Sequence, residues 1–376
     1  MKRLSLFTAF VALVAVGCAE KSDKQPRNVI AVVNDTTFEV ADSVESVTEM
    51  TAERPLTVAV VGDIMMGSTY PDHDLTADDG ASLFQDAAPI LQRVDIAAGN
   101  LEGSLFDGQG KPKNCPPDSH CFTFKMPTRY VNHLLEAGFD FVSLANNHIN
   151  DFGPEAKDTT QAVLKRAGVA YAGVNGSCPT AIIEKDGRKI GFAAFGFNPG
   201  MPSIHKYKEV EKLVSGLREE CDFVIVSFHG GGEGKDFQHV PHTTETAFGH
   251  NRGDVEKFAH TAIDAGADLV YGHSPHVTRA LELYNDRLIV YSLGNFCTPY
   301  KFNLSGVNGY APIVEVTLNP DGTFANGDIH SFIQRSGVGP RTDSSHIVAR
   351  NMARLTREDF PKTPLHISDT GKISRK

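Results

Sequence analysis

Apolar runs alternate with amphipathic segments along the middle of the chain, which is the pattern of an α/β protein. Continuous apolar runs such as Leu56 to Val61 predict strands that are buried on both faces. An Asp-Gly pair between two such runs, in Lys185-Asp186-Gly187-Arg188, predicts a hairpin turn. Beyond Ile333 the chain becomes polar, and we expect no further core element there. Strands are predicted over residues 56–61, 95–98, 139–144, 181–184, 189–195, 223–228, 269–271, 281–284, 288–293, 313–318 and 323–332, and helices over residues 81–91, 128–137, 154–167, 206–219 and 253–265.

The N-terminus has the three parts of a secretory signal peptide. A basic start, Met1-Lys2-Arg3, precedes an apolar run from Leu4 to Val16 that is too short to span a bilayer. The segment Ala15-Val16-Gly17-Cys18 is either the end of an ordinary signal with a chance cysteine or a lipobox. We favour the lipobox, with residues 1–17 as the signal peptide, a lipid on Cys18 and a polar tether over residues 18–54. The protein is then expected to be exported and lipid-anchored in the cell envelope, at the periplasmic face, the outer membrane or the outer face of a Gram-positive membrane.

Composition narrows the kind of molecule that the rest of the chain forms. The 376 residues carry a formal net charge of −10, which argues against a nucleic-acid-binding surface, because such a surface is basic. With 41% hydrophobic and 22% charged residues, the composition is that of an ordinary globular protein. We expect one large domain over residues 55–320, followed by a C-terminal strand and polar extension over residues 321–376.

Two cysteines flank a short polar loop. Cys115 and Cys121 enclose the segment Pro-Pro-Asp-Ser-His, and an oxidising compartment favours a local disulfide between them. The alternative is a pair of free loop thiols. Cys297 lies in an apolar run, and we expect it to be a free thiol.

Short polar clusters follow nearly every predicted strand. Ligands bind at the carboxyl ends of the strands in α/β sheets, so these clusters are expected to meet in space. They contain carboxylates, amides and imidazoles, which suit divalent cations, and they contain no thiolates, which excludes a cysteine-type structural zinc site. Alone, each has an ordinary structural explanation, such as a helix cap or a turn. Together they predict a metal site, and they include Asp63, Glu102, Asn147, His148, His229, Glu233, His273, His276 and Asn295.

The clusters also form a set of longer motifs. These are G-D-I-M-M-G from Gly62, N-L-E from Asn100, L-A-N-N-H from Leu144 followed by D-F-G from Asp151, the segment His229 to Glu233, G-H-S-P-H-V from Gly272, and Y-S-L-G-N-F from Tyr291. The set resembles the bacterial capsule-synthesis family, which is CapA-like and linked to poly-γ-glutamate. That family looks like a branch of the calcineurin-like metallophosphoesterases. The resemblance runs from about Thr57 to Leu318 and implies a four-layer α/β/β/α sandwich.

The resemblance implies a role for each matching residue. Asp63 stands where the superfamily's first aspartate binds a metal, and Glu102 stands where an acid bridges two metals. His148 matches the histidine that assists the leaving group, and Asp151 is placed to orient it. The cofactor is then one or two divalent metal ions, either Mn, Zn, Fe or Mg. The implied metal ligands are Asp63, Glu102, Asn147, His229, His273 and His276.

This sequence departs from the superfamily pattern at the first metal. The superfamily has a histidine two residues after the first aspartate, and this chain has Met65, a poor ligand for hard cations. The spacing between His273 and His276 is also one residue longer than usual. The first metal is therefore weakly bound, absent, or completed by water, by His73 or by Glu233.

Two functions fit these observations. The first is a membrane-anchored, divalent-metal-dependent hydrolase that cleaves a phosphoester or a γ-glutamyl amide in capsule or poly-γ-glutamate synthesis or processing. The second is a non-catalytic lipoprotein that binds, assembles or exports an anionic capsule polymer. In both cases the expected partners are the anionic polymer or its precursor, the membrane through the lipid, and a polymer synthase or export complex. Glu233, Asn295, Arg279 and Lys301 lie near the site motifs and are candidates for the substrate pocket.

Overall fold

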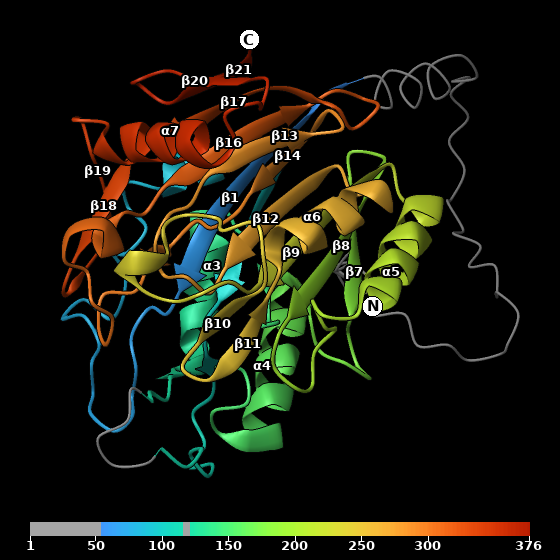
Figure 1. The fold of residues 1–376 in the computed structure, drawn as a ribbon. Helices are drawn as coiled ribbons and strands as arrows, with labels where there is room; N and C mark the ends of the chain where they lie inside the picture. Colours follow the sequence, from blue (N-terminus) through green and yellow to red (C-terminus); the bar gives the residue numbers. More distant parts are fainter. Residues whose placement is uncertain (1–53, 116–120) are drawn as a thin grey trace, which may run out of the picture.

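The computed structural model of this protein describes residues 54–115 and 121–376 (Figure 1). In this part of the chain a nine-stranded and a six-stranded sheet form the centre of the molecule. The predicted signal peptide, Cys18 and nearly all of the predicted tether lie outside the described residues. Among the helices of the described ranges, none has the length and apolar composition that a membrane span requires.

The first sheet has the strand order β20-β21-β17-β16-β1-β2-β5-β6, and β15 also pairs with β1. Its central strands β1, β2, β5 and β6 are mutually parallel, so their carboxyl ends lie at one edge. Strand β16 joins β1 in the antiparallel sense. The bounds are β1 (Leu56–Ile64), β2 (Ile96–Leu101), β5 (Phe141–Ser143), β6 (Ala170–Ala172), β15 (Asn295–Cys297), β16 (Ile313–Leu318), β17 (Phe324–His330), β20 (Leu365–Ile367) and β21 (Lys372–Arg375).

The second sheet has the strand order β13-β14-β12-β9-β8-β7. Strands β8, β9, β12 and β14 are parallel, while β7 and β13 are joined to the sheet by hairpins. The predicted Asp186-Gly187 turn is confirmed, because both residues adopt positive φ between β7 and β8. The bounds are β7 (Thr180–Lys185), β8 (Arg188–Gly196), β9 (Phe223–His229), β12 (Leu269–His273), β13 (Leu281–Tyr284) and β14 (Arg287–Val290).

Side-chain alternation along the strands fills the two sides of each sheet. In β9, Ile225 packs into the core between the sheets, whereas Val224 and Val226 pack into a second core beneath α5 and α6. Helices α3 and α4 pack on the first sheet, which completes the predicted four-layer α/β/β/α sandwich (Figure 1). The α-helices are α2 (Ala88–Leu91), α3 (Val131–Ala137), α4 (Gly153–Ala167), α5 (Tyr207–Glu220), α6 (Val255–Asp264) and α7 (Ile347–Asp359).

Smaller elements connect these layers. The helix predicted over residues 81–91 is confined to α2, because the residues before it form successive turns with bonds such as Leu83 N–H to Gly80 O. The remaining elements are the short strands β3 (Ser104–Leu105), β4 (Lys125–Met126), β10 (Glu245–Ala247), β11 (His250–Gly253), β18 (Phe332–Arg335) and β19 (Val338–Thr342), and the 3₁₀ helices η1 (Thr128–Tyr130), η2 (Lys235–Phe237) and η3 (Gly306–Gly309).

The expectation of no core element beyond Ile333 is wrong. Helix α7 buries Val348, Met352 and Leu355 completely, at the i, i+4, i+7 spacing of an amphipathic helix. It also supports the edge strand β13, because the Thr356 hydroxyl accepts a hydrogen bond from the Leu281 N–H at 2.9 Å. The C-terminal segment is therefore part of the packed body.

Candidate metal centre

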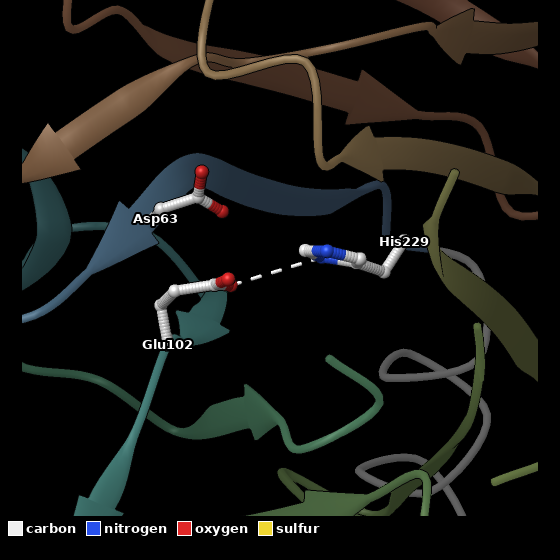
Figure 2. Close-up of side chains that lie close together, drawn as sticks. All are labelled: Asp63, Glu102 and His229. Carbon is white, nitrogen blue, oxygen red and sulfur yellow. Dashed lines mark ion pairs between the residues drawn. The ribbon is translucent and has the colours of Figure 1, made fainter. Parts of the chain in front are cut away.

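Three buried side chains converge where strands of the two sheets end. Asp63 lies near the end of β1, Glu102 directly follows β2, and His229 ends β9. Their ligand atoms all lie within 4.8 Å of one another, and Figure 2 shows the three side chains pointing toward a common space. Glu102 Oε2 is 3.7 Å from His229 Nδ1. The structure thus brings together residues that are far apart in the sequence, as the strand-end argument predicted.

Close backbone packing holds Asp63 in this place. The Asp63 N–H donates to the carbonyl of Gly294 at 2.9 Å, in the turn before β15. A Cβ atom on Gly62 would lie 2.0 Å from that same carbonyl oxygen, so only glycine allows the approach. In the sequence Gly62-Asp63, the glycine therefore allows the close backbone contact, and the aspartate directly after it is the candidate metal ligand.

Two further histidines contact Asp63 from the end of β12 and the loop after it. His273 Nδ1 lies 3.3 Å from Asp63 Oδ1, and His276 Nδ1 lies 2.7 Å from Asp63 Oδ2. His273 pairs in register with His229 across β12 and β9, so the two imidazoles come from adjacent parallel strands. Both predicted histidine ligands therefore lie at the centre.

Several buried polar atoms of this group have no hydrogen-bond partner. Among the described residues they include Glu102 Oε1, Asn147 Oδ1, His229 Nδ1 and His273 Nε2. A buried polar atom without a partner costs about 1–3 kcal/mol, and three at the centre, with a fourth on Asn147 in the chain directly before His148, require an explanation. All four come from oxygen and nitrogen donors of the kinds that bind Zn, Mn or Fe, so the residues fit a divalent metal ion.

The electrostatics of the centre favour the same interpretation. Burial and repulsion from Asp63 raise the pKa of Glu102 well above its ordinary value. Burial would also raise the pKa of Asp63, but the hydrogen bonds and charges of His273 and His276 lower it below the ordinary range. Burial lowers the pKa of His229 well below its ordinary value, which keeps the imidazole neutral and able to bind a metal. Burial would lower the pKa of His276, but the hydrogen bond and charge of Asp63 raise it to about 9, so His276 supplies positive charge beside Asp63, and a divalent cation would supply it beside Glu102 as well.

Asn100 has a role that the sequence analysis did not assign to it. Its Nδ2 donates to Asp63 Oδ1 at 2.8 Å and also to Glu102 Oε2. Its Oδ1 accepts from Asn146 Nδ2 at 3.0 Å, which fixes the orientation of the amide. Asn100 therefore holds the two carboxylates in relation to each other. The available signal was its position in the same polar cluster as Glu102, at the end of β2.

His148 is held beside this centre in a defined orientation. Its Nδ1 is 2.7 Å from Asp151 Oδ2, and its Nε2 is 3.9 Å from Glu102 Oε1. The imidazole stacks on Phe124 at 4.1 Å between ring centroids. Burial lowers the pKa of His148, and the charge and hydrogen bond of Asp151 oppose that shift. The predicted pair is thus assembled, with Nε2 on the side of Glu102.

Asp151 is itself fixed by two further contacts. It is fully buried, accepts a hydrogen bond from the Phe124 N–H at 2.8 Å, and forms an ion pair with Lys113 at 2.6 Å. These contacts restrain the carboxylate, and through it the orientation of His148.

Met65 stands where the superfamily has a histidine ligand, and Glu233 is the proposed replacement that lies near this first metal position. Met65 is fully buried, and His73 is exposed. Glu233 Oε1 lies 3.9 Å from His276 Nε2, and its Oε2 accepts from the Arg252 guanidinium at 3.1 Å. Of the two side chains that the sequence suggested, only Glu233 is in contact with a predicted ligand of this position.

Two of the candidates for the substrate pocket, Asn295 and Arg279, are buried and bonded to other parts of the protein. Asn295 is buried, and its Nδ2 donates to the carbonyl of His276 at 3.2 Å, so it supports a ligand loop. Arg279 is fully buried and forms a two-pronged pair with Glu245 at 2.8 and 2.7 Å. The expectation that Arg279 meets an anionic ligand is therefore wrong, because a carboxylate from β10 already occupies its guanidinium.

A cleft of about 840 Å³ lies next to the His148 side of the centre. Its wall includes Lys113, which contacts Asp151, and Thr123, which precedes the ring that stacks on His148. The predicted disulfide between Cys115 and Cys121 is present and frames one side of the cleft. The lining residues are Tyr70, Pro71, Lys111, Pro112, Lys113, Asn114, Cys115, Cys121, Phe122, Thr123 and Lys301.

Comparison with known families assigns the chain. The profile of the family described as "Bacterial capsule synthesis protein PGA_cap" matches residues 57–300. The chain belongs to this family. Two curated relatives support the assignment: "Capsule biosynthesis protein CapA" of Bacillus anthracis is 29% identical over 261 residues, and "PGA biosynthesis protein CapA" of Bacillus subtilis is 31% identical over 258 residues. The matches cover 64% of this chain in both cases, and 59% and 63% of those relatives, so the chain spans less than two thirds of the length of either.

Solved structures similar to this PGA_cap member include calcineurin-like phosphoesterases and nucleotidases. The calcineurin-like phosphoesterase YfkN from Bacillus subtilis is 16% identical with a TM-score of 0.44, and the match covers 74% of this chain and 91% of that one. A 5'-nucleotidase precursor from Thermus thermophilus is 13% identical with a TM-score of 0.43, and the match covers 75% of this chain and 55% of that one. These likenesses concern the fold alone.

Proposed function

We propose that this PGA_cap member is an exported, lipid-anchored, divalent-metal-dependent hydrolase that acts in capsule or poly-γ-glutamate synthesis or processing. The observation that carries the proposal is the set of unpartnered buried ligand atoms on Glu102, Asn147, His229 and His273, beside an oriented His148–Asp151 pair. A binding protein has no need for a directed imidazole next to a metal centre, and a hydrolase does. When bound, a divalent cation supplies Lewis acidity and lowers the pKa of water.

The residues divide the work of hydrolysis between them. Glu102, Asn147, His229 and His273 would hold one metal ion, and Asp63, His276 and Glu233 would complete a second position around the shared Glu102. His148 would give a proton from Nε2 to the leaving group when the ring is doubly protonated, and the Asp151 carboxylate at Nδ1 stabilises that imidazolium and orients the ring. Asn100 holds Asp63 and Glu102 in place throughout.

The cleft beside His148 suits an anionic substrate. Lys111 is exposed on its wall, and Lys301 also lines it, with its ammonium paired to Asp74 at 2.8 Å. On a chain with a net charge of −10, the exposed Lys111 on this cleft wall would attract an anionic polymer that the rest of the surface repels. The bond cleaved is a phosphoester or a γ-glutamyl amide, and the lipid on Cys18 would keep the enzyme at the membrane, near a polymer synthase or export complex.

The test is hydrolysis by the mature protein, produced without a His tag and loaded in turn with manganese, zinc, iron and magnesium. Bis-p-nitrophenyl phosphate reports phosphodiester cleavage, and shortening of γ-linked polyglutamate reports amide cleavage. We expect turnover with at least one metal and substrate, and its loss with a chelator. A fully metal-loaded protein that binds the polymer and cleaves neither substrate would establish the non-catalytic lipoprotein instead.

Glu233→Gln is expected to lower the metal content by roughly one ion per chain at limiting metal. The neutral amide is a weaker ligand than a carboxylate, and it no longer balances His276 and Arg252. Metal per chain, measured by mass spectrometry after dialysis, checks this. The matched control is Asp236→Asn, which removes one negative charge from an exposed position three residues away. Equal metal content in the two variants would rule out Glu233 as a ligand.

Lys111→Glu is expected to weaken binding of γ-linked polyglutamate by roughly 3- to 10-fold at low salt. Reversing an exposed charge on the cleft wall changes its interaction with an anion by about 1 kcal/mol. Fluorescence anisotropy with a labelled polymer measures the Kd, and the effect should shrink in high salt. Lys165→Glu, at an exposed position of α4, is the control. If both variants bind equally well, the polymer does not use this cleft.

A further inference from the structure

A second group of histidine and glutamate side chains lies apart from the proposed metal centre. Glu256 and His260 are one turn apart on α6, and Glu282 comes from the neighbouring strand β13. One ligand atom from each lies within 4.8 Å of the others, and all three side chains are half-buried. Helix α6 covers the outer side of the second sheet, so this group shares no residue with the centre at the strand ends (Figure 1).

The side chains of this group are held in position by their neighbours. His260 Nε2 is 2.9 Å from Glu282 Oε2, and the Tyr291 hydroxyl donates to the same oxygen at 2.7 Å. The His260 ring stacks on Tyr284 with 3.7 Å between centroids and 7° between planes. These contacts fix the imidazole and the carboxylate before any ligand arrives, which lowers the entropic cost of binding one.

His242 approaches the group from the loop before β10. Its Nδ1 is 2.6 Å from Glu256 Oε2, and its Nε2 donates to the carbonyl of Asp359 at 3.1 Å. An imidazole that donates one N–H to a backbone carbonyl presents the lone pair of its other nitrogen, which is how metal-binding histidines are oriented. Here that nitrogen faces the Glu256 carboxylate at hydrogen-bond distance, so a proton lies between them and His242 fixes the orientation of Glu256.

The charge balance of the group also favours a cation. Glu256 and Glu282 bring two carboxylates together, and within the described part of the chain their ion-pair partners are histidines alone. The ammonium of Lys257 lies instead over the Tyr207 ring at 4.7 Å. Two acids and one imidazole, on Glu256, Glu282 and His260, are ligands of the kinds that bind zinc, as in sites with three protein ligands and a water.

We propose that Glu256, His260 and Glu282 form a second divalent-cation site, with His242 as a positioning residue that holds the Glu256 carboxylate. Such a site would join helix α6 to the edge strand β13, and the loop before β10 would support it through the contact between His242 and Glu256. Its expected effect is on stability, because an ion held by Glu256, His260 and Glu282 would tie helix α6 to the edge strand β13 in the folded state alone. The proposal is independent of the proposed hydrolase activity.

The experiment separates the two sites by starting from His229→Ala, in which the first centre is disabled. Full-length mature protein carrying this change is titrated with zinc and with cobalt. We expect about one zinc ion per chain, a rise of about 2–4 °C in Tm on zinc addition, and the visible absorption of tetrahedral cobalt. Adding His260→Ala or Glu282→Gln should abolish all three signals, whereas adding His250→Ala, at an exposed position of β11, should leave them unchanged.

Failure of folding is distinguished from failure of binding by the Tm of each variant without zinc. Glu282→Gln is the conservative change, because glutamine keeps an acceptor for Tyr291. If the His229→Ala protein binds no more zinc than the double variants, and its Tm does not respond to zinc, the proposal is overturned. The four residues would then be hydrogen-bonded pairs that balance one another without a metal.

Discussion

His229→Ala is expected to remove most of the metal from the centre formed by Asp63, Glu102 and His229. The imidazole is only 2% exposed, its Nδ1 lacks a hydrogen-bond partner, and it lies 3.7 Å from Glu102. Loss of groups that merely orient ligands costs metal affinity about 10- to 100-fold, and loss of a ligand itself should cost at least as much. Metal per chain, measured on protein purified without a His tag, should therefore fall by one or two ions.

His250→Ala is the control for this measurement, since it removes an exposed histidine and leaves the centre intact. The comparison must be the difference between variants, because the site at Glu256, His260 and Glu282 would keep its own ion. If His229→Ala and His250→Ala retain the same metal after incubation with manganese, zinc and iron, the hydrolase proposal fails. Polymer-binding assays would then take its place.

The part of the centre that could be predicted from sequence is the part set by parallel strands. Each apolar run ends in a polar cluster, and parallel strands of one sheet bring their carboxyl ends to one edge, which places Asp63 near Glu102 and His229 near His273. This reasoning needs no knowledge of which strands are neighbours. It works because every candidate ligand follows its strand directly in the chain. The meeting of these two pairs depends in addition on how the two sheets pack together.

The part of the centre that could not be predicted depends on contacts between strands and loops that are distant in the sequence. Asn100 bonds to Asp63 because β1 and β2 are adjacent in register, and nothing within either strand reveals that pairing. Arg279 looked available until Glu245, from a short strand 34 residues earlier, proved to be its partner. A buried ion pair between distant segments leaves no local pattern, so a sequence argument tends to mistake such an arginine for a ligand contact.

Helix α7 was missed for a different reason. Its buried positions Val348, Met352 and Leu355 follow the helical period, but arginines stand between them and make the segment polar on average. The apolar residues of this segment had helical spacing, but its high average polarity led us to expect a polar extension without a helix. The helix forms because it covers the edge of β13 and packs into the second core through Leu355.

His148→Ala is expected to lower kcat by about 10²- to 10⁴-fold on a substrate with a poor leaving group, with little change in KM or in bound metal. His148 Nε2 faces the centre 3.9 Å from Glu102, and Asp151 holds Nδ1 at 2.7 Å, so the ring is placed to give a proton and not to bind the ion. Asp151→Asn should produce a smaller loss of the same kind, because the ring stays but its orientation is less restrained. Steady-state kinetics with metal content measured on the same samples checks both variants.

The choice of leaving group separates proton donation from a structural role. A p-nitrophenolate leaves readily without a proton, whereas an alkoxide or an amine does not, so the loss of His148 should be much smaller on the nitrophenyl ester than on an alkyl ester or amide. Collapse of the site would lower both rates alike, because neither substrate can do without the metal and Glu102. An equal loss on the two classes, with metal retained, would show that His148 acts before the bond-breaking step. If the loss of kcat in His148→Ala increases with the basicity of the leaving group, His148 donates its proton in the bond-breaking step. Asp151 then supports His148 in that step.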